Sequence, residues 1–229
     1  MRIHRNILGA TVALAILVPT DAPAQSTDVP TVAVMDFSGF MLGQAGNSEP
    51  IGKAVSAMLV TEFAERDGLM VLERQQIQAL LQEQRLTLSG RVDESSAVEI
   101  GKLLGVQYVF HGSVVSIATQ LRIDIRAVDV ETSEIKAVMK STDLTINLFD
   151  VVVGIADKFG EELDLPPLSE RPDIEPIPIG ATIAFSRAVD YEDKGETEKA
   201  IEQYEAVLEI HRNHRDAQRA LDRLRGGGA

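Results

Sequence analysis

The spacing of apolar residues predicts strands that alternate with helices in the first half of the chain. Two short β-rich runs lie at 31–37 and 69–72, and the first is followed by a glycine-rich loop. Between the runs, apolar side chains recur at steps of three and four residues from Ile51 until Gly68. This period is typical of a helix with one face against a core.

Two more helices are expected after the second strand. Apolar positions over 77–90 indicate an amphipathic helix that ends at a Ser-Gly pair. The next helix has two suitable N-cap residues, Asp93 and Ser95, and Gly105 suits a left-handed residue at its C-terminal end.

Three strands, a covering helix and a helical tail complete the pattern. The runs 106–117, 121–130 and 135–144 are joined by short polar turns, which predicts an antiparallel meander, and 148–163 forms a long amphipathic helix. In the middle strand, apolar residues alternate with charged ones, so that one face is buried: Leu121, Ile123, Ile125 and Ala127. We therefore predict an α/β fold, an α+β sandwich-like domain of mixed sheet and covering helices, followed by an α-helical tail.

The chain divides into four predicted segments. Residues 1–24 read as a cleavable signal peptide, because a basic start precedes a twelve-residue apolar run and a small-residue cleavage site. A retained membrane anchor is the alternative, but the twelve-residue apolar run is shorter than the about 20 apolar residues that a spanning helix needs. The α/β domain then occupies 25–163, a proline-rich linker 164–179 and the tail 180–229. We expect an exported, periplasmic protein that is peripheral to the outer membrane at most.

Composition excludes several kinds of function. The net charge of −13 disfavours binding to nucleic acid, which requires a basic face. The absence of cysteine excludes disulfides, thiolate metal sites, cysteine nucleophiles and a lipid-modified N-terminal cysteine.

The residue types that could carry chemistry do not form a recognised motif. Gly52-Lys53 opens a helix after a glycine-rich loop, but a phosphate-binding loop would need glycine at Asn47 and a hydroxyl at Ala54. We therefore expect no catalytic residue, no cofactor and no metal, and interpret the protein as a non-enzyme.

The remaining polar candidates favour structural interpretations. His211 and His214 are expected to be solvated on a helix, and Asp36 to cap a turn at the end of the first strand. Glu73 and Arg74 follow the second strand, and Arg74 could pair with a carboxylate across the domain.

Several strings taken in order resemble the CsgG/HfaB (curli assembly) family over roughly 30–163. They run from VAVMDF at 32–37 through IGK at 51–53 and VLER at 71–74 to LLGVQYV and GSV at 103–114. The matching motif positions, which we interpret as structural or interface residues, are Asp36, Gly52, Glu73, Arg74, Gly105 and Gly112.

The resemblance implies an exported protein, since members are mostly outer-membrane lipoproteins and the prototype forms an oligomeric secretion channel. Two departures are evident. The chain has no lipobox cysteine, and its turns between 114 and 139 leave no room for the membrane-spanning hairpins of the channel-forming relatives.

The tail resembles a single tetratricopeptide repeat with a further helix after it. The positions that carry this likeness are Ala188, Tyr191, Gly195, Ala200, Tyr204 and Val207. Because such arrays need about three repeats to be stable, one repeat must lean on another surface. Packing on the domain and docking of a partner are both open.

Three functions follow from these observations. The first is a non-enzymatic envelope protein that supports assembly or secretion of a surface structure by binding other envelope or secretion proteins, or further copies of itself. The second is a periplasmic activator or regulator of penicillin-binding proteins, because lipoprotein activators of those enzymes have a similar fold. The third is an enzyme with an unrecognised site.

Overall fold

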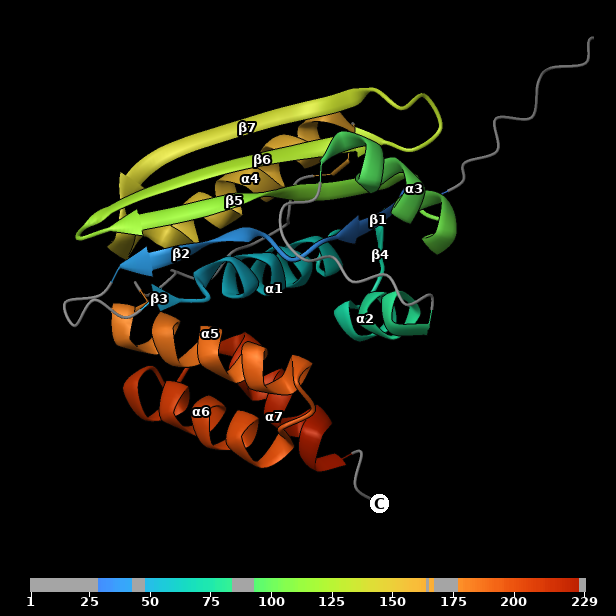
Figure 1. The fold of residues 1–229 in the computed structure, drawn as a ribbon. Coiled ribbons are helices and arrows are strands. Elements are labelled where there is room, and N and C mark those ends of the chain that lie inside the picture. The colour runs from blue at the N-terminus through green and yellow to red at the C-terminus, as the bar shows by residue number, and fades with distance from the viewer. Residues whose placement is uncertain (1–28, 43–47, 84–92, 164, 167–176, 227–229) are drawn as a thin grey trace, which may run out of the picture.

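The computed structural model describes residues 29–42, 48–83, 93–163, 165–166 and 177–226. The predicted signal peptide, the end of the second predicted helix and most of the predicted linker lie outside these residues. Where the chain is described, it forms one mixed sheet with helices on both faces and three further helices stacked on one side (Figure 1).

The sheet is centred on the long strand β5. Its seven strands are β1 (Thr31–Val34), β2 (Ser38–Leu42), β3 (Ser48–Glu49), β4 (Met70–Val71), β5 (Tyr108–Ile117), β6 (Gln120–Asp129) and β7 (Ile135–Leu144). Along one edge β5 pairs in parallel first with β1 and then with β2, and along its other edge it starts the antiparallel β5–β6–β7 meander. The short strand β4 pairs in parallel with β1.

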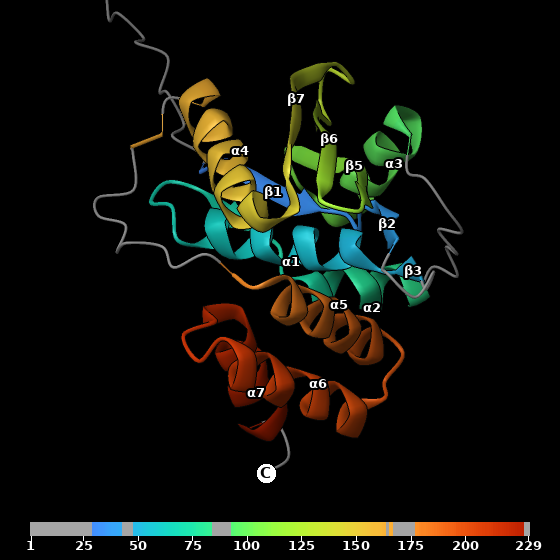
Figure 2. The ribbon, with the colours of Figure 1, turned by 90° about the vertical axis from the view of Figure 1, so that its left-hand side faces the viewer.

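Four helices cover the two faces of the sheet. They are α1 (Ile51–Ala64), α2 (Arg74–Glu83), α3 (Glu94–Leu104) and α4 (Leu148–Glu162), the last preceded by the 3-10 turn η1 (Thr145–Asn147). Helices α1 and α4 pack on one face, and α2 and α3 on the other (Figure 2).

Each face has its own core. The smaller core lies under α2 and α3, and its centre is formed by Ala33, Met35 and Val109. The larger core lies under α1 and α4, where Phe110 of the sheet meets Phe63 and Phe159 with ring centroids 4.8 and 4.4 Å apart. Aromatic rings bury more apolar area than other side chains, so this trio contributes much of the packing energy.

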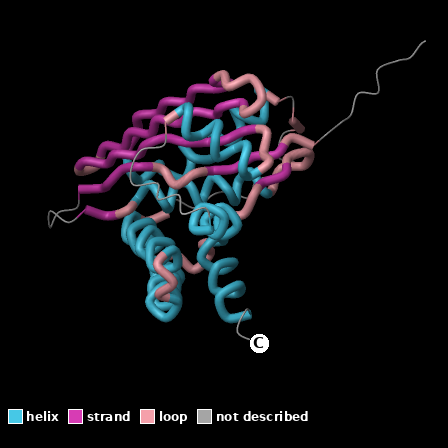
Figure 3. The backbone as a smooth tube through the Cα atoms, turned by 45° about the vertical axis from the view of Figure 1, so that its right-hand side comes forward, coloured by secondary structure: helices cyan, strands magenta, loops and turns pink. Residues whose placement is uncertain are grey.

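The C-terminal helices continue the larger core. They are α5 (Ile179–Asp193), α6 (Thr197–Ile210) and α7 (Arg215–Gly226), and they lie on the side of α1 that faces away from the sheet (Figures 1 and 3). Buried residues of all three belong to the same apolar cluster as α1 and α4. Ten of the fourteen residues of α1 are therefore buried, because the helix is packed from both sides.

The predicted α/β fold is confirmed, with differences at element boundaries. The meander, α4 and the Asp93 and Gly105 ends of α3 are as predicted: the Asp93 carboxylate accepts a hydrogen bond from the Ser96 N–H, and Gly105 has φ 68°. The main error is β2, which lies in a region predicted as loop. It forms because β5 extends beyond the end of β1 and offers five more residues for pairing.

Candidate functional site

Arg74, which begins α2, binds carboxylates from two distant parts of the chain. Strands β1 and β4 are parallel, so their carboxyl ends meet, and this brings Arg74 next to Asp36. The Arg74 Nε and Nη2 donate to Asp36 Oδ1 at 2.9 and 2.5 Å. Its Nη1 and Nη2 also donate to Asp193 of α5, each at 2.8 Å. One guanidinium therefore joins the α/β domain to the tail.

Lys53, in the first turn of α1, binds the same part of α5. Its Nζ lies 2.8 Å from Asp190 Oδ1 and 2.8 Å from Asp193 Oδ2. Asp190 and Asp193 are three residues apart and so share one face of the helix. We call Asp36, Lys53, Arg74, Asp190 and Asp193 the Arg74 cluster.

The two cations of the Arg74 cluster are held in their charged forms. Burial by itself would lower the pKa of the Arg74 guanidinium, but hydrogen bonds with Asp193 and the charge of Asp36 outweigh it, so the pKa is raised. The pKa of Lys53 is also raised, because its bonds to Asp190 and Asp193 outweigh burial.

A second set of ion pairs fixes α7 to the C-terminal half of α1. Arg215 pairs with Glu62 at 2.8 Å and with Glu65 at 2.7 Å, and Arg219 pairs with Glu65 at 2.8 Å. Glu62 is only 2% exposed. Burial opposes ionisation of Glu65, yet the two arginines outweigh it and lower its pKa. We call these four residues the Glu62 cluster.

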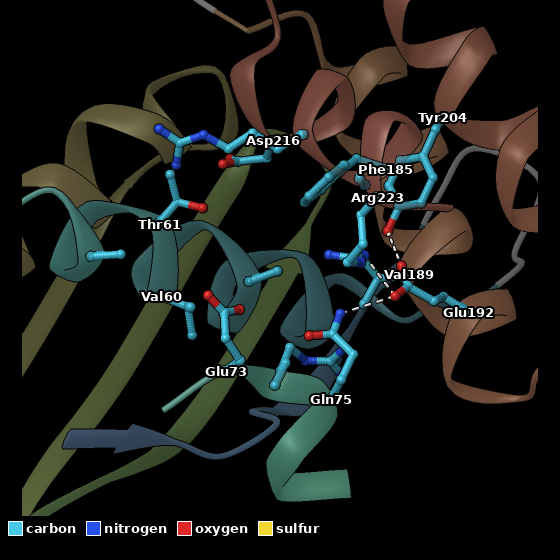
Figure 4. A pocket seen from close by; sticks show the side chains of 15 residues that line it. Val60, Thr61, Glu73, Gln75, Phe185, Val189, Glu192, Tyr204, Asp216 and Arg223 are labelled. Atoms are coloured by element: carbon cyan, nitrogen blue, oxygen red, sulfur yellow. Dashed lines mark hydrogen bonds and ion pairs between the residues drawn. The ribbon is translucent and has the colours of Figure 1, made fainter. Parts of the chain in front are cut away.

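Between the two clusters lies a cavity of about 170 Å³. Its walls come from α1, the start of α2 and all three tail helices, as Figure 4 shows. On one side Tyr204 donates to Glu192 at 2.9 Å, and Glu192 also accepts from Gln75 at 3.0 Å and from Arg223 at 2.7 Å. Ala57, Val60, Phe185 and Val189 supply apolar wall.

Asp216 lies at the other side of this cavity, in the first turn of α7. It shares a hydrogen bond with the Thr61 side chain, while its Oδ1 is buried and has no hydrogen-bond partner within the described residues. Burial raises its pKa to about 6.

The prediction that His211 and His214 are solvated is wrong. They are 8% and 2% exposed, because α6 ends at Ile210 and both residues lie in the turn that leads into α7. The His214 ring packs on Phe185 at 4.8 Å between centroids, and its Nδ1 accepts a hydrogen bond from the N–H of Ala217. Burial lowers the pKa of His214 to about 4.

The predicted family-motif positions are spread over the domain. Asp36 and Arg74 are brought together, and Asp36 accepts from the Arg74 and Gln78 side chains instead of the expected turn cap. Glu73 is exposed at the edge of the cavity, Gly105 ends α3, and Gly112 lies opposite Ile125 in the β5–β6 ladder.

Gly52 marks a close approach between α1 and the sheet. A Cβ atom at this position would lie 2.0 Å from the carbonyl oxygen of Phe37. Only glycine allows the first turn of α1 to pass so near the link between β1 and β2.

Four of the six repeat-like positions form the interior of the helical tail. Ala188, Ala200, Tyr204 and Val207 are at most 2% exposed. Tyr191 is half-buried, and Gly195 takes φ 72° in the turn between α5 and α6.

Sequence reasoning missed the tail's half of the site. Asp190 and Asp193 lie in an acidic stretch that also contains Glu192, Glu196 and Glu198, so nothing in their spacing distinguishes them from solvated residues. Arg74 itself was predicted to pair with a carboxylate across the domain, and it does so with Asp36.

Residues 18–122 match the family described as curli production assembly/transport component CsgG. This part of the chain is thus a CsgG-like module. No curated protein matches the chain.

Several solved structures are similar to part of the chain. The LpoB C-terminal domain from Salmonella enterica is 19% identical, with 50% of this chain and 82% of that chain covered and a TM-score of 0.41. Lipoprotein GNA1162 from Neisseria meningitidis is 12% identical, with 58% and 98% covered and a TM-score of 0.41. The PelC dodecamer from Paraburkholderia phytofirmans is 11% identical, with 63% of this chain and 94% of that chain covered and a TM-score of 0.37.

Within the described ranges, no helix has the length and apolar character needed to cross a membrane. Nor do the side chains described there include three or more histidine or acidic groups placed to hold a metal ion.

Proposed function

We propose that the protein is a non-enzymatic component of the cell envelope that supports assembly or secretion of a surface structure by binding other proteins. The observation that carries the proposal is the match of residues 18–122 to a family of assembly and transport components. The motif residues Asp36 and Arg74 take part in a contact between two parts of the chain, which is consistent with a structural or interface role.

The tail is the part that we assign to partner binding. Its α5 is occupied by the contact with α1, whereas α6 presents a solvent-exposed row that includes Glu198, Glu202 and Glu209. In this proposal the tail is a tetratricopeptide-like hairpin that leans on the domain through α5 and meets a partner through α6.

The export route belongs to the same proposal. A cleaved signal peptide over 1–24 would deliver the mature chain to the periplasm, and the N-terminus of the purified protein would then be Gln25. N-terminal mass spectrometry of protein isolated from its host tests this step.

The proposed function is tested by site-specific photo-crosslinking in the host. A photoreactive residue replaces Glu202 on α6, and the matched control replaces the exposed Thr142 on β7. We expect Glu202 to give a discrete adduct with an envelope protein, and a strain without the gene to lose secreted or surface-exposed material. Unchanged surface material in that strain overturns the proposal, and altered peptidoglycan cross-linking instead favours the regulator of penicillin-binding proteins.

A further inference from the structure

The cavity between the two ion-pair clusters contains hydrogen-bonding capacity that the chain does not use. Asp216 is one of the residues that line the cavity, and its Oδ1 is buried without a hydrogen-bond partner among the described residues. A buried acceptor left unsatisfied costs about 1–3 kcal/mol, so such atoms in native proteins normally have a partner. A ligand that donates a hydrogen bond would supply it.

The charges around the cavity specify the sign of that ligand. Each of the three arginines in its wall already has a carboxylate: Arg74 has Asp36 and Asp193, Arg219 has Glu65, and Arg223 has Glu192. An anion would therefore have to displace an existing ion pair.

The two remaining acids are not neutralised in the same way. Asp216 has the Thr61 hydroxyl on one oxygen and only the more distant charges of Arg215 and Arg219 to compensate it, and Glu73 forms no ion pair within the described part of the chain. Figure 4 shows these two side chains reaching into the cavity region from α7 and from the start of α2. Asp216 is half-buried, and Glu73 lies at the exposed edge, where its charge would attract a cation.

The size and the wall of the cavity define the rest of the ligand. At about 170 Å³ it is below the range of about 300–1,000 Å³ that holds drug-sized molecules. Ala57, Val60 and Val189 offer apolar contacts for a short methylene stem.

From these observations we propose that the cavity binds an alkylammonium group, with Asp216 Oδ1 accepting its hydrogen bond and the apolar wall holding its stem. The group could belong to a small primary amine or to a lysine side chain of another protein. This site goes beyond the proposed function, and because it is measured on the purified chain, its failure would leave that function untouched.

The test is NMR titration of the full chain at pH 7.5, where the Asp216 carboxyl is ionised, with labelled valine and alanine methyl groups. We expect n-butylammonium to produce saturable shifts at Val60, Val189 and Ala57. Neutral n-butanol, which has the same stem, should bind at least tenfold more weakly. Nα-acetyl-lysine methylamide separates the sources: equal binding indicates a lysine side chain, and binding of n-butylammonium alone indicates a free amine.

Variants make the proposal falsifiable. Asp216→Asn removes the charge and keeps the shape, so we expect at least a tenfold loss of affinity; Glu73→Gln should lose about twofold to threefold. Glu99→Gln on α3 is the matched control, because Glu99 is exposed and does not line the cavity, and it should leave the affinity unchanged. Circular dichroism verifies that each variant is folded. The proposal is overturned if n-butylammonium gives no saturable shift, if n-butanol binds equally well, or if a folded Asp216→Asn variant keeps full affinity.

Discussion

Replacement of Arg74 by alanine tests whether the Arg74 cluster holds the tail to the domain. The variant leaves Asp36 and Asp193, whose side chains are 27% and 14% exposed, without their shared cation. Removing one partner of a buried ion pair costs about 3–5 kcal/mol. Because both carboxylates keep some contact with water and Lys53 still binds Asp193, we expect the lower part of this range, about 3 kcal/mol.

Urea denaturation followed by circular dichroism measures this loss as a change in the free energy of unfolding. A double-mutant cycle with Asp193→Ala should give a coupling energy of about 1–3 kcal/mol, since the two side chains share two hydrogen bonds. Arg74→Lys should recover only part of the loss, because an ammonium group cannot bind two carboxylates as a planar fork does.

The matched control is Arg122→Ala on β6. Arg122 also pairs with an aspartate, Asp124, but its side chain is 63% exposed, and we expect a change within about 0.5 kcal/mol. If Arg74→Ala is no more destabilising than this control, or if its coupling to Asp193 is zero, the cluster does not stabilise the contact and the reasoning fails.

The remaining predictions concern pH and close packing. The folded-state pKa of Asp216, about 6, lies above its ordinary 3.8, so wild type should lose stability relative to Asp216→Asn by about 1–3 kcal/mol as pH rises from 4 to 6. The folded-state pKa of His214, about 4, lies below its ordinary 6.5, so wild type should gain stability relative to His214→Asn by about 1–3 kcal/mol as pH rises from 4 to 6.5. Urea titrations at each pH measure both effects. Parallel pH curves for wild type and a variant would contradict the prediction for that residue. Gly52→Ala should destabilise the fold by about 1–3 kcal/mol, because the new methyl group meets backbone atoms. Gly154→Ala in α4, where a Cβ has no atom within 4 Å, should stabilise it by about 0.5–1 kcal/mol. Equal shifts of the melting temperature in the two variants would refute the packing argument.

Elements whose signals are local could be predicted from the sequence. The alternation of apolar and charged residues along β6 predicted which of its faces is buried, because successive side chains of a strand point to opposite faces of the sheet. Asp93 and Gly105 marked the ends of α3 because capping depends only on residues a few positions apart.

Elements that depend on distant partners could not be predicted in this way. The segment Ser38–Leu42 is a strand because β5 is longer than β1 and extends past its end. The lengths of these two strands cannot be inferred from the residues of Ser38–Leu42 itself. The burial of His214 arises from its contact with Phe185, about thirty positions earlier in the chain.

In the candidate site, too, local signals could be predicted from the sequence and distant partners could not. Arg74 stood out because it directly follows a predicted strand, and a pairing across the domain was expected. Its second partner, Asp193, is 119 positions away, and only the packing of α5 on α1 brings it within reach.

The position of α1 between the sheet and the tail has a consequence for local opening. Its backbone amides can meet solvent only after one of the two flanking layers has separated, whereas α6 and β7 each have an outer side in water. Hydrogen–deuterium exchange should therefore be slower in α1 than in α6 and β7. The order in which the other amides exchange would then report which layer leaves first, the sheet with α4 or the three tail helices.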